Sequence, residues 1–250
     1  MSNLLADLEA GRQRAAWPDA SAAGGWRVDP SVKEGILALF LADNRTWSVG
    51  ATFHFADRAT LPTRDVPDGV RVVPGGTTVR AGAYLAPSVV VMPPSYVNIG
   101  AWVGAGSMVD SHVLVGSCAQ IGERVHLSAG VQVGGVLEPA GARPVIVEDG
   151  AFVGSRCIVT EGAVIGEQAI LGAGVVITAS IPIVDVTGAA PVEYRAFVPP
   201  RAVVVPGVRQ REFPAGTYGL PTPLIVGWRE EAHDLKVSLN DALREHGIGA

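Results

Sequence analysis

The chain has 250 residues, with 24 acidic and 19 basic side chains and a formal net charge of −5. Since no basic cluster is present, binding to nucleic acid or to an anionic membrane surface is not expected. The charged N-terminal segment lacks the apolar core of a signal peptide, and no apolar run reaches the ~18 residues that span a bilayer, so the composition predicts a soluble, cytoplasmic protein.

Residues 1–69 are expected to form a small, mostly helical N-terminal domain. A first helix is predicted over Asn3–Ala15. A second begins after Asp29, whose side chain is suited to cap a helix with proline at its first position. Alternation of polar and apolar residues predicts a strand over Trp47–Phe55, and 62–69 is expected to be a linker.

Residues 70–205 carry a repeat of six residues, which defines the fold class. Every sixth residue is a branched aliphatic, and the residue four places later is mostly small or short-branched. A helix repeats at 3.6 and a strand at 2, whereas a parallel β-helix built of hexapeptide repeats places one aliphatic on each side of a triangular coil. The aliphatic series is Val73, Val79, Leu85, Val91, Val97, Val103, Val109, Val115, Ile121, Leu127 and Val133, then Val147, Val153, Val159, Ile165, Leu171 and Ile177.

The phase breaks once, over residues 138–146. The register moves from Val133 to Val147, two residues more than the repeat allows, and the segment contains Pro139, Gly141 and Pro144. A loop is therefore predicted to protrude from the coil stack, and loops on rigid scaffolds often carry binding groups.

Residues 206–250 are expected to cap the C-terminal end of the stack, because a solenoid must cover its open apolar ends. A last coil side is predicted near Val198–Val203. Glu212–Trp228 is predicted to be a two-stranded ribbon, and Ser238–His246 a short final helix capped by Ser238.

Several sequence motifs within the repeat point to one family more specifically than the six-residue period does. They closely resemble the tetrahydrodipicolinate N-succinyltransferase family over roughly residues 69–246. The matching motifs are MPPSYVNIGAWV (92–103), GSMVDS (106–111), VGSCAQIGERVHLSAG (115–130), GGVLEP (134–139), VEDGAFVGSRCIVTEG (147–162), DVTG (185–188) and SLNDALR (238–244).

The resemblance implies an all-β core in the form of a left-handed parallel β-helix, and a homotrimer with active sites between subunits. The implied reaction transfers a succinyl group from succinyl-CoA to the amine of 2-amino-6-oxopimelate, the hydrated, ring-opened form of tetrahydrodipicolinate. Coenzyme A is then a co-substrate, the partners are small molecules, and no metal is expected.

Two site residues follow from matching positions. Asp110 matches the family's acidic residue, which would hold or deprotonate the substrate amine. Arg71 matches the family's substrate-binding arginine, whose fork can bind a carboxylate bidentately. Without the resemblance, Asp110 could be a polar coil corner and Arg71 an exposed ion-pair partner.

The chain departs from some relatives at a second catalytic position, where Ile158 stands in place of a glutamate. Glu161 matches an acid common to the family and is the nearest remaining carboxylate, so it is the second catalytic candidate. Glu138 also matches, although an acid beside a proline could simply brace the loop.

Coenzyme A is expected along the late coils. Gly172, Ala173 and Gly174 would allow close approach of the backbone, and Arg201, Arg209 and Arg211 are candidates for its phosphates. Ordinary surface arginines need no such role, so that alternative stays open.

The histidines suggest two alternative kinds of site, a zinc site and a histidine general base. His112 and His126 lie in the repeat, whereas His54, His233 and His246 lie outside it, which disfavours the three-histidine zinc site of β-helical hydrases. A histidine base, His112 above all, is the alternative to Asp110 for acyl transfer. An acetyl donor, another amino-acid acceptor, or a non-catalytic scaffold are the alternative functions.

Cys118 and Cys157 give neither a disulfide framework nor metal-ligand spacing. Cys157 falls at an inward repeat position, where a small core residue is expected.

Overall fold

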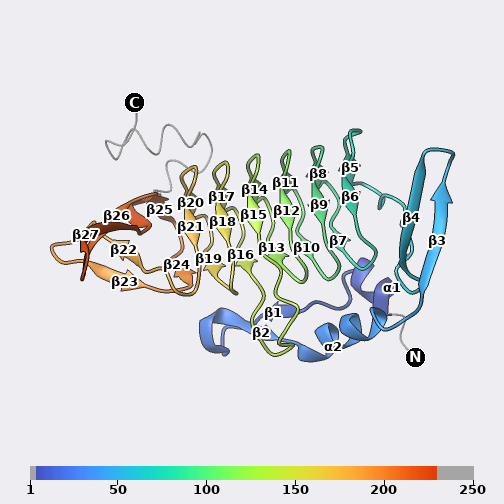
Figure 1. Cartoon of the computed structure of the whole chain (residues 1–250), viewed down its shortest axis with the longest axis horizontal. Helices are drawn as coiled ribbons and strands as arrows, with labels where there is room; N and C mark the ends of the chain where they lie inside the picture. The colour runs from blue at the N-terminus through green and yellow to red at the C-terminus, as the bar shows by residue number, and fades with distance from the viewer. Residues whose placement is uncertain (1–3, 230–250) are drawn as a thin grey trace.

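The computed structural model describes residues 4–229, and its centre is a parallel β-helix with three walls (Figure 1). We call the walls the long sheet, the open sheet and the covered sheet. The chain passes through them in that order in each coil. The helix predicted over Ser238–His246 lies outside the described residues. Among the described residues, no helix is long and apolar enough to cross a bilayer.

The long sheet has ten strands. They are β5 (Arg71–Val72), β8 (Val90–Val91), β11 (Met108–Val109), β14 (His126–Leu127), β17 (Phe152–Val153), β20 (Ile170–Leu171), β25 (Ala202–Val205), β28 (Leu224–Trp228), β22 (Ile183–Asp185) and β23 (Val192–Tyr194), in spatial order. Neighbours pair in parallel from β5 to β25, whereas β25–β28 and β22–β23 are antiparallel.

The other two walls have six strands each. The open sheet contains β6 (Thr78–Val79), β9 (Tyr96–Val97), β12 (Leu114–Val115), β15 (Gln132–Val133), β18 (Ile158–Val159) and β21 (Val176–Ile177). The covered sheet contains β7 (Tyr84–Leu85), β10 (Trp102–Val103), β13 (Gln120–Ile121), β16 (Ile146–Val147), β19 (Val164–Ile165) and β24 (Phe197–Val198).

The inward residues of the coils form one continuous core. From Leu85 to Ile177, the second residue of each short strand points inward, as do Ala101 and Cys157 from the small-residue series, and all of these belong to the main core cluster. Val72 and Val79 of the first coil are partly buried and pack against it. Burial raises the pKa of the Cys157 thiol to about 11. The six-residue phase therefore places the core as predicted over Leu85–Ile177.

The first coil differs from the prediction. Val72, not Val73, pairs with the inward Val91, whereas Val79 pairs with Val97 in the expected register. The first coil thus holds one extra residue, and Gly75 (φ +140°) and Gly76 (φ +92°) lie in that turn. Val73 was predicted to point inward, and that prediction is wrong.

The N-terminal segment lies along the covered sheet (Figure 1). Its elements are α1 (Leu4–Glu9), β1 (Ala16–Pro18), the 3-10 turn η1 (Ala23–Gly25), β2 (Trp26–Val28), α2 (Pro30–Leu39), β3 (Asn44–Val49) and β4 (Phe53–Arg58). The Asp29 side chain caps α2 as expected, by accepting a hydrogen bond from the Ser31 amide. The first helix was predicted to reach Ala15, but it ends at Glu9, because Gly11 adopts a positive φ of +70° against Tyr84 and Trp102.

Arg14 fixes this segment to the coils. Its guanidinium lies 3.8 Å from the centre of a Trp102 ring, and its Nε donates to Gln120 Oε1 at 3.0 Å. Burial lowers the pKa of Arg14 to about 10. The Trp26 indole donates to Glu148 Oε1 at 2.7 Å. These contacts place residues 14–26 against the outer surface of the covered sheet.

Two hairpins project from the ends of the coil stack (Figure 1). The strand predicted over Trp47–Phe55 is instead the hairpin β3–β4, since Gly50 turns the chain with a φ of +61°. At the other end, β26 (Val208–Phe213) pairs with β27 (Gly216–Pro221), whereas β28 pairs with β25. The ribbon predicted over Glu212–Trp228 was therefore displaced, because the last five residues join the long sheet.

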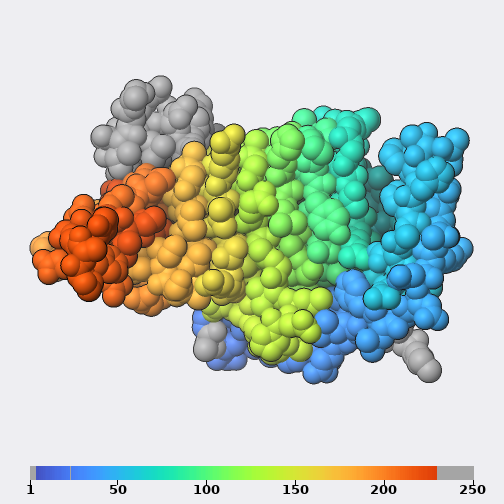
Figure 2. Space-filling view, in the orientation of Figure 1, coloured from blue at the N-terminus to red at the C-terminus, as the bar shows by residue number. Residues whose placement is uncertain are grey.

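Figure 2 shows the same elongated body with a continuous surface over the coils.

Candidate active site

Asp110 lies at the corner where the long sheet turns into the open sheet, and its backbone is held on both sides. Its amide donates to Leu127 O of the next coil at 3.0 Å, and its carbonyl accepts from Ser95 Oγ of the previous coil at 2.8 Å. Ser95 is itself almost completely buried. The Asp110 carboxylate accepts from the Ser111 amide at 2.7 Å and remains half-exposed. The corner therefore presents a fixed carboxylate to the outside.

Arg71 lies on the same wall as Asp110. It is the outward residue of β5, it is exposed, and β8 separates its strand from β11. Adjacent strands are about 4.8 Å apart, so the two strands are roughly 10 Å apart. An arginine side chain and a dicarboxylate can bridge that separation.

Gly172, Ala173 and Gly174 occupy the equivalent corner three coils later. Backbone hydrogen bonds connect the corners of successive coils: the amides of Asp110, Ser128 and Gly154 donate to the carbonyls of Leu127, Val153 and Leu171, respectively. Gly172 thus lies in the same row of corners as Asp110. Gly174 has a φ of +77° and open space where a side chain would stand. A ligand lying along this edge could contact both groups.

Glu161 lies at a different edge, where the open sheet turns into the covered sheet. Its Oε2 accepts from the Ala179 amide at 2.9 Å, and its side chain is exposed. The two proposed catalytic carboxylates are therefore not brought together within one chain. Ile158 is the outward residue of β18 and is 38% exposed on the open sheet.

The loop predicted at residues 138–146 protrudes beside Glu161. Arg143 Nε donates to Gly162 O at 2.8 Å, and a side chain at Gly162 would lie 2.4 Å from Arg143 O. The loop, Glu161 and the exposed Glu138 line a cavity of about 420 Å³.

A buried lysine holds the same loop from the other side. Lys33 of α2 is 0% exposed, and its ammonium donates to Ala142 O at 2.5 Å. Burial lowers the Lys33 pKa and raises the pKa of the neighbouring Cys118 thiol to about 12, so a neutral thiol is favoured. Sequence reasoning missed this contact, because 109 residues separate its partners.

The candidate phosphate-binding arginines are divided between two places. Arg201 lies at the corner between β24 and β25, where its Nε donates to Arg229 O at 2.7 Å and its Nη1 contacts Gln168. Arg209 pairs with Glu193 at 2.7 Å, and Arg211 lies 5.4 Å from the Phe213 ring centre, both on the β26–β27 hairpin. Arg201 is thus a brace between coils and lies at a different corner from Gly172.

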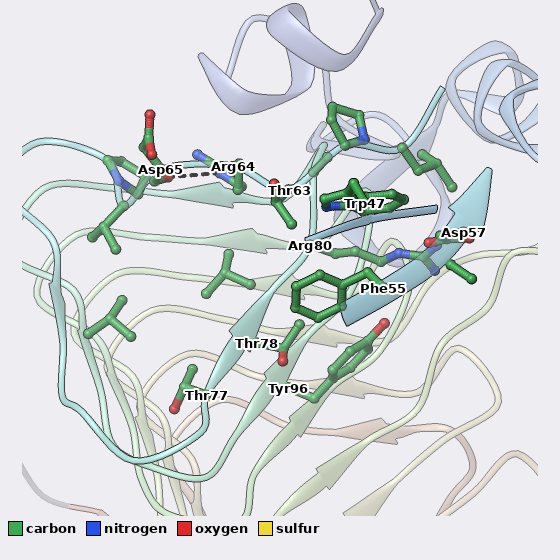
Figure 3. Close-up of a pocket in the computed structure, with 18 residues that line it drawn as sticks. Trp47, Phe55, Asp57, Thr63, Arg64, Asp65, Thr77, Thr78, Arg80 and Tyr96 are labelled. Carbon is green, nitrogen blue, oxygen red and sulfur yellow. Dashed lines mark hydrogen bonds and ion pairs between the residues drawn. The ribbon is translucent and has the colours of Figure 1, made fainter. Parts of the chain in front are cut away.

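A separate cavity of about 520 Å³ lies between the β3–β4 hairpin and the first coils (Figure 3). Trp47, Phe55 and Tyr96 supply aromatic walls, and Arg80 pairs with Asp57 within it. Val72, the neighbour of Arg71, also lines it. The cavity therefore places aromatic and apolar surface beside the Arg71 end of the long sheet.

Comparison with known proteins gives consistent matches. A family model described as the hexapeptide repeat of succinyl-transferase matches residues 144–179. A 2,3,4,5-tetrahydropyridine-2,6-dicarboxylate N-succinyltransferase of Dechloromonas aromatica is 41% identical over 251 residues, covering 98% of this chain and 89% of that protein. The protein of the same name from Paramagnetospirillum magneticum is 43% identical over 233 residues, covering 89% and 81%.

A solved structure from Campylobacter jejuni, provisionally described as a 2,3,4,5-tetrahydropyridine-2-carboxylate N-succinyltransferase, aligns with a TM-score of 0.51 at 17% identity. The alignment covers 90% of this chain and 62% of that one, and at this identity it bears on the fold alone. The shared fold is the left-handed parallel β-helix, which confirms the architecture expected from the resemblance.

Proposed function

The chain belongs to the 2,3,4,5-tetrahydropyridine-2,6-dicarboxylate N-succinyltransferase family, and on this premise we propose that it transfers a succinyl group from succinyl-CoA to the amine of 2-amino-6-oxopimelate. This is the N-acylation step of diaminopimelate and lysine biosynthesis. The main structural support for this proposal is that the oriented Asp110 carboxylate and Arg71 lie on the same wall of the β-helix.

The chemistry assigns a part to each of these groups. The amine must lie next to the thioester carbon and lose a proton, and a carboxylate that is already oriented can hold it there. Arg71 would bind the far carboxylate of the acceptor, because the roughly 10 Å between β5 and β11 suits a seven-carbon dicarboxylate held between the two side chains.

Coenzyme A is proposed to lie along the edge that contains Gly172, Ala173 and Gly174. That edge continues the Asp110 row, which would bring the thioester toward the amine. Arg209 and Arg211 stay candidates for the phosphates, since both are exposed on the hairpin beyond the last coils. Arg201 is better explained by its bonds between coils. No metal is required by this scheme, and the cytoplasmic location stays a prediction.

A thiol-release assay tests the function directly. Purified protein is mixed with succinyl-CoA or acetyl-CoA, with and without tetrahydrodipicolinate. We expect rapid thiol release with succinyl-CoA that depends on the acceptor. Preference for acetyl-CoA would make the protein an N-acetyltransferase instead, and no release with either donor would favour a scaffold.

We also propose a homotrimer. The long and open sheets carry apolar outward residues that the N-terminal segment leaves uncovered, among them Ile158, which is 38% exposed. Phe53 and Phe55 of the β3–β4 hairpin stack on each other and are 61% and 40% exposed. Contact between copies would cover such surface and could bring the Glu161 edge of one copy to the Asp110 edge of another.

Light scattering should therefore report three times the mass of one chain at micromolar concentration. Dilution to a monomer should abolish activity. A fully active monomer would contradict the trimer and any site shared between subunits.

Arg71→Lys should raise the KM for the acceptor about tenfold while kcat changes less. Lysine keeps the charge but cannot reproduce a bidentate fork. Steady-state kinetics with the acceptor varied at saturating succinyl-CoA measures the effect. Arg45→Lys on β3 is a matched control of an arginine outside the proposed site. An unchanged KM in Arg71→Lys would remove Arg71 from the acceptor site.

Glu161→Gln tests whether the second carboxylate takes part. Glutamine can still accept the hydrogen bond from the Ala179 amide, so the corner should fold normally and the lost charge is the main change. If the Glu161 edge faces Asp110 across a subunit boundary, kcat should fall about tenfold, equal to about 1.4 kcal/mol in the activation barrier. Wild-type kcat in the variant would leave Asp110 as the one catalytic carboxylate of the scheme.

A further inference from the structure

His126 lies next to Asp110 on the outer surface of the long sheet. Its strand β14 pairs with β11 in a register that sets His126 opposite Met108, and Asp110 follows two residues after Met108. The hydrogen bond from the Asp110 amide to Leu127 O fixes this register at the corner itself. Met108, Asp110 and His126 all alternate with inward residues, so the imidazole and the carboxylate share one surface.

The imidazole is held in a defined orientation. Its ring stacks on Phe152 of the next coil, with ring centres 4.8 Å apart and planes only 2° from parallel. The side chain is half-buried between β11 and β17. A ring fixed in this way presents its edge nitrogens at a constant place, which is what a proton acceptor requires.

The surroundings keep this imidazole available at neutral pH. Burial lowers the His126 pKa, and the Asp110 carboxylate opposes that effect by raising it. The strands packed against β14 contribute Asp110 after β11 and the uncharged Phe152 on β17. Arg124, two residues before His126, is directed to Glu123 at 2.8 Å and to Asp149. Asp110 is therefore the charge that governs this ring.

The side chain beside Asp110 is of the type best suited to remove the proton from an amine. An imidazole has an ordinary pKa of about 6.5, close to neutral pH. The general base of an efficient transfer has a pKa close to the working pH. A carboxylate that orients the amine, beside an imidazole that accepts its proton, divides the two tasks between groups suited to each.

We propose that His126 is the general base of the acyl transfer and that Asp110 orients the acceptor amine beside it. The inference rests on the proposed function. As the amine nitrogen bonds to the thioester carbon, its proton passes to the imidazole. As the carbon–sulfur bond breaks, the imidazolium returns that proton to the departing thiolate. The products are the amide and the coenzyme A thiol, and His126 is neutral again.

His112 does not meet the same conditions. It is exposed in the turn after Asp110, with a φ of +62°, and its backbone bonds the neighbouring coils through Pro94 O and Gln132 Nε2. Among the described residues, its ring has no stacking partner. It therefore provides a matched histidine for comparison.

The experiment compares His126→Gln with His112→Gln in the thiol-release assay with succinyl-CoA and acceptor. We expect kcat to fall about 10²-fold in His126→Gln and less than threefold in His112→Gln, with unchanged affinity for coenzyme A. In the wild type, kcat/KM should fall at acid pH with a pKa below the usual histidine value, and this limb should be absent in His126→Gln. Turnover in His126→Gln within threefold of the wild type would overturn the inference.

A second measurement does not depend on the folding of His126→Gln. NMR titration of the wild type should give His126 the same pKa as the acid limb of kcat/KM. In Asp110→Asn, that pKa should fall further, because the charge that raised it is gone. A His126 pKa that differs from the kinetic one by more than a unit would overturn the inference. If the wild type and His126→Gln are both active, the role of His126 is rejected and the proposed function stands. If the wild type is inactive with both acyl donors, the proposed function is rejected as well.

Discussion

Asp110→Asn should lower the rate of succinyl transfer by about 10²–10⁴, the range in which positioned acid–base groups usually contribute. Asparagine has the same shape and can still accept the hydrogen bond from the Ser111 amide, so the corner should keep its geometry. What the variant lacks is the negative charge that attracts and orients the amine. It also removes the charge that raises the pKa of His126.

The loss should appear in kcat and in kcat/KM for the acceptor, and the dissociation constant of coenzyme A should barely change. Steady-state kinetics and calorimetric titration with coenzyme A measure these quantities separately. Asp19→Asn is a matched control, because the Asp19 carboxylate also accepts from a backbone amide, that of Ser21, but lies in the N-terminal segment. Near wild-type turnover in Asp110→Asn would remove Asp110 from the reaction.

The coil repeat determines which residues of the candidate site can be placed relative to one another from the sequence. Residues separated by 18 positions lie above one another, so the period alone sets His126 over Met108 and beside Asp110. The same arithmetic separates Glu161 from Asp110, since the two do not fall at equivalent corners. The six-residue period by itself therefore argues against a two-carboxylate site within one chain.

Other features could not be derived from the period. Val73 falls on the six-residue series, but the first turn contains one residue more than the later turns, at Gly75 and Gly76. Val72 therefore points inward in place of Val73. The contact of Lys33 with the loop depends on how α2 lies along the coils, and nothing local in the sequence encodes that. The hairpin β3–β4 was missed because its turn glycine interrupts what looked like one alternating strand.

The tight stacking of the coils leads to the largest expected effect on stability, that of Gly116→Ala. A Cβ at Gly116 would lie 2.2 Å from the amide nitrogen of Gly135 and 2.6 Å from the carbonyl carbon of Gly134, both backbone atoms of the next coil. Gly116 also donates to Val133 O at 2.8 Å, so the two coils cannot separate without losing this hydrogen bond. The φ of Gly116 is not positive, and the penalty therefore comes from the contact and not from backbone strain.

We expect Gly116→Ala to lower the free energy of unfolding by about 3 kcal/mol, the upper end of the range for overpacked interiors. Gly141→Ala is the matched control: no atom lies within 4 Å of its added Cβ and its φ is not positive, so stability should be unchanged or slightly increased. Urea denaturation of both variants at one protein concentration measures the difference, since oligomer stability depends on concentration. The atoms that a Cβ at Gly116 would meet are backbone atoms, so no small side-chain movement can relieve the contact. Equal urea midpoints for Gly116→Ala and Gly141→Ala would therefore mean that the coils are not packed backbone against backbone at this position.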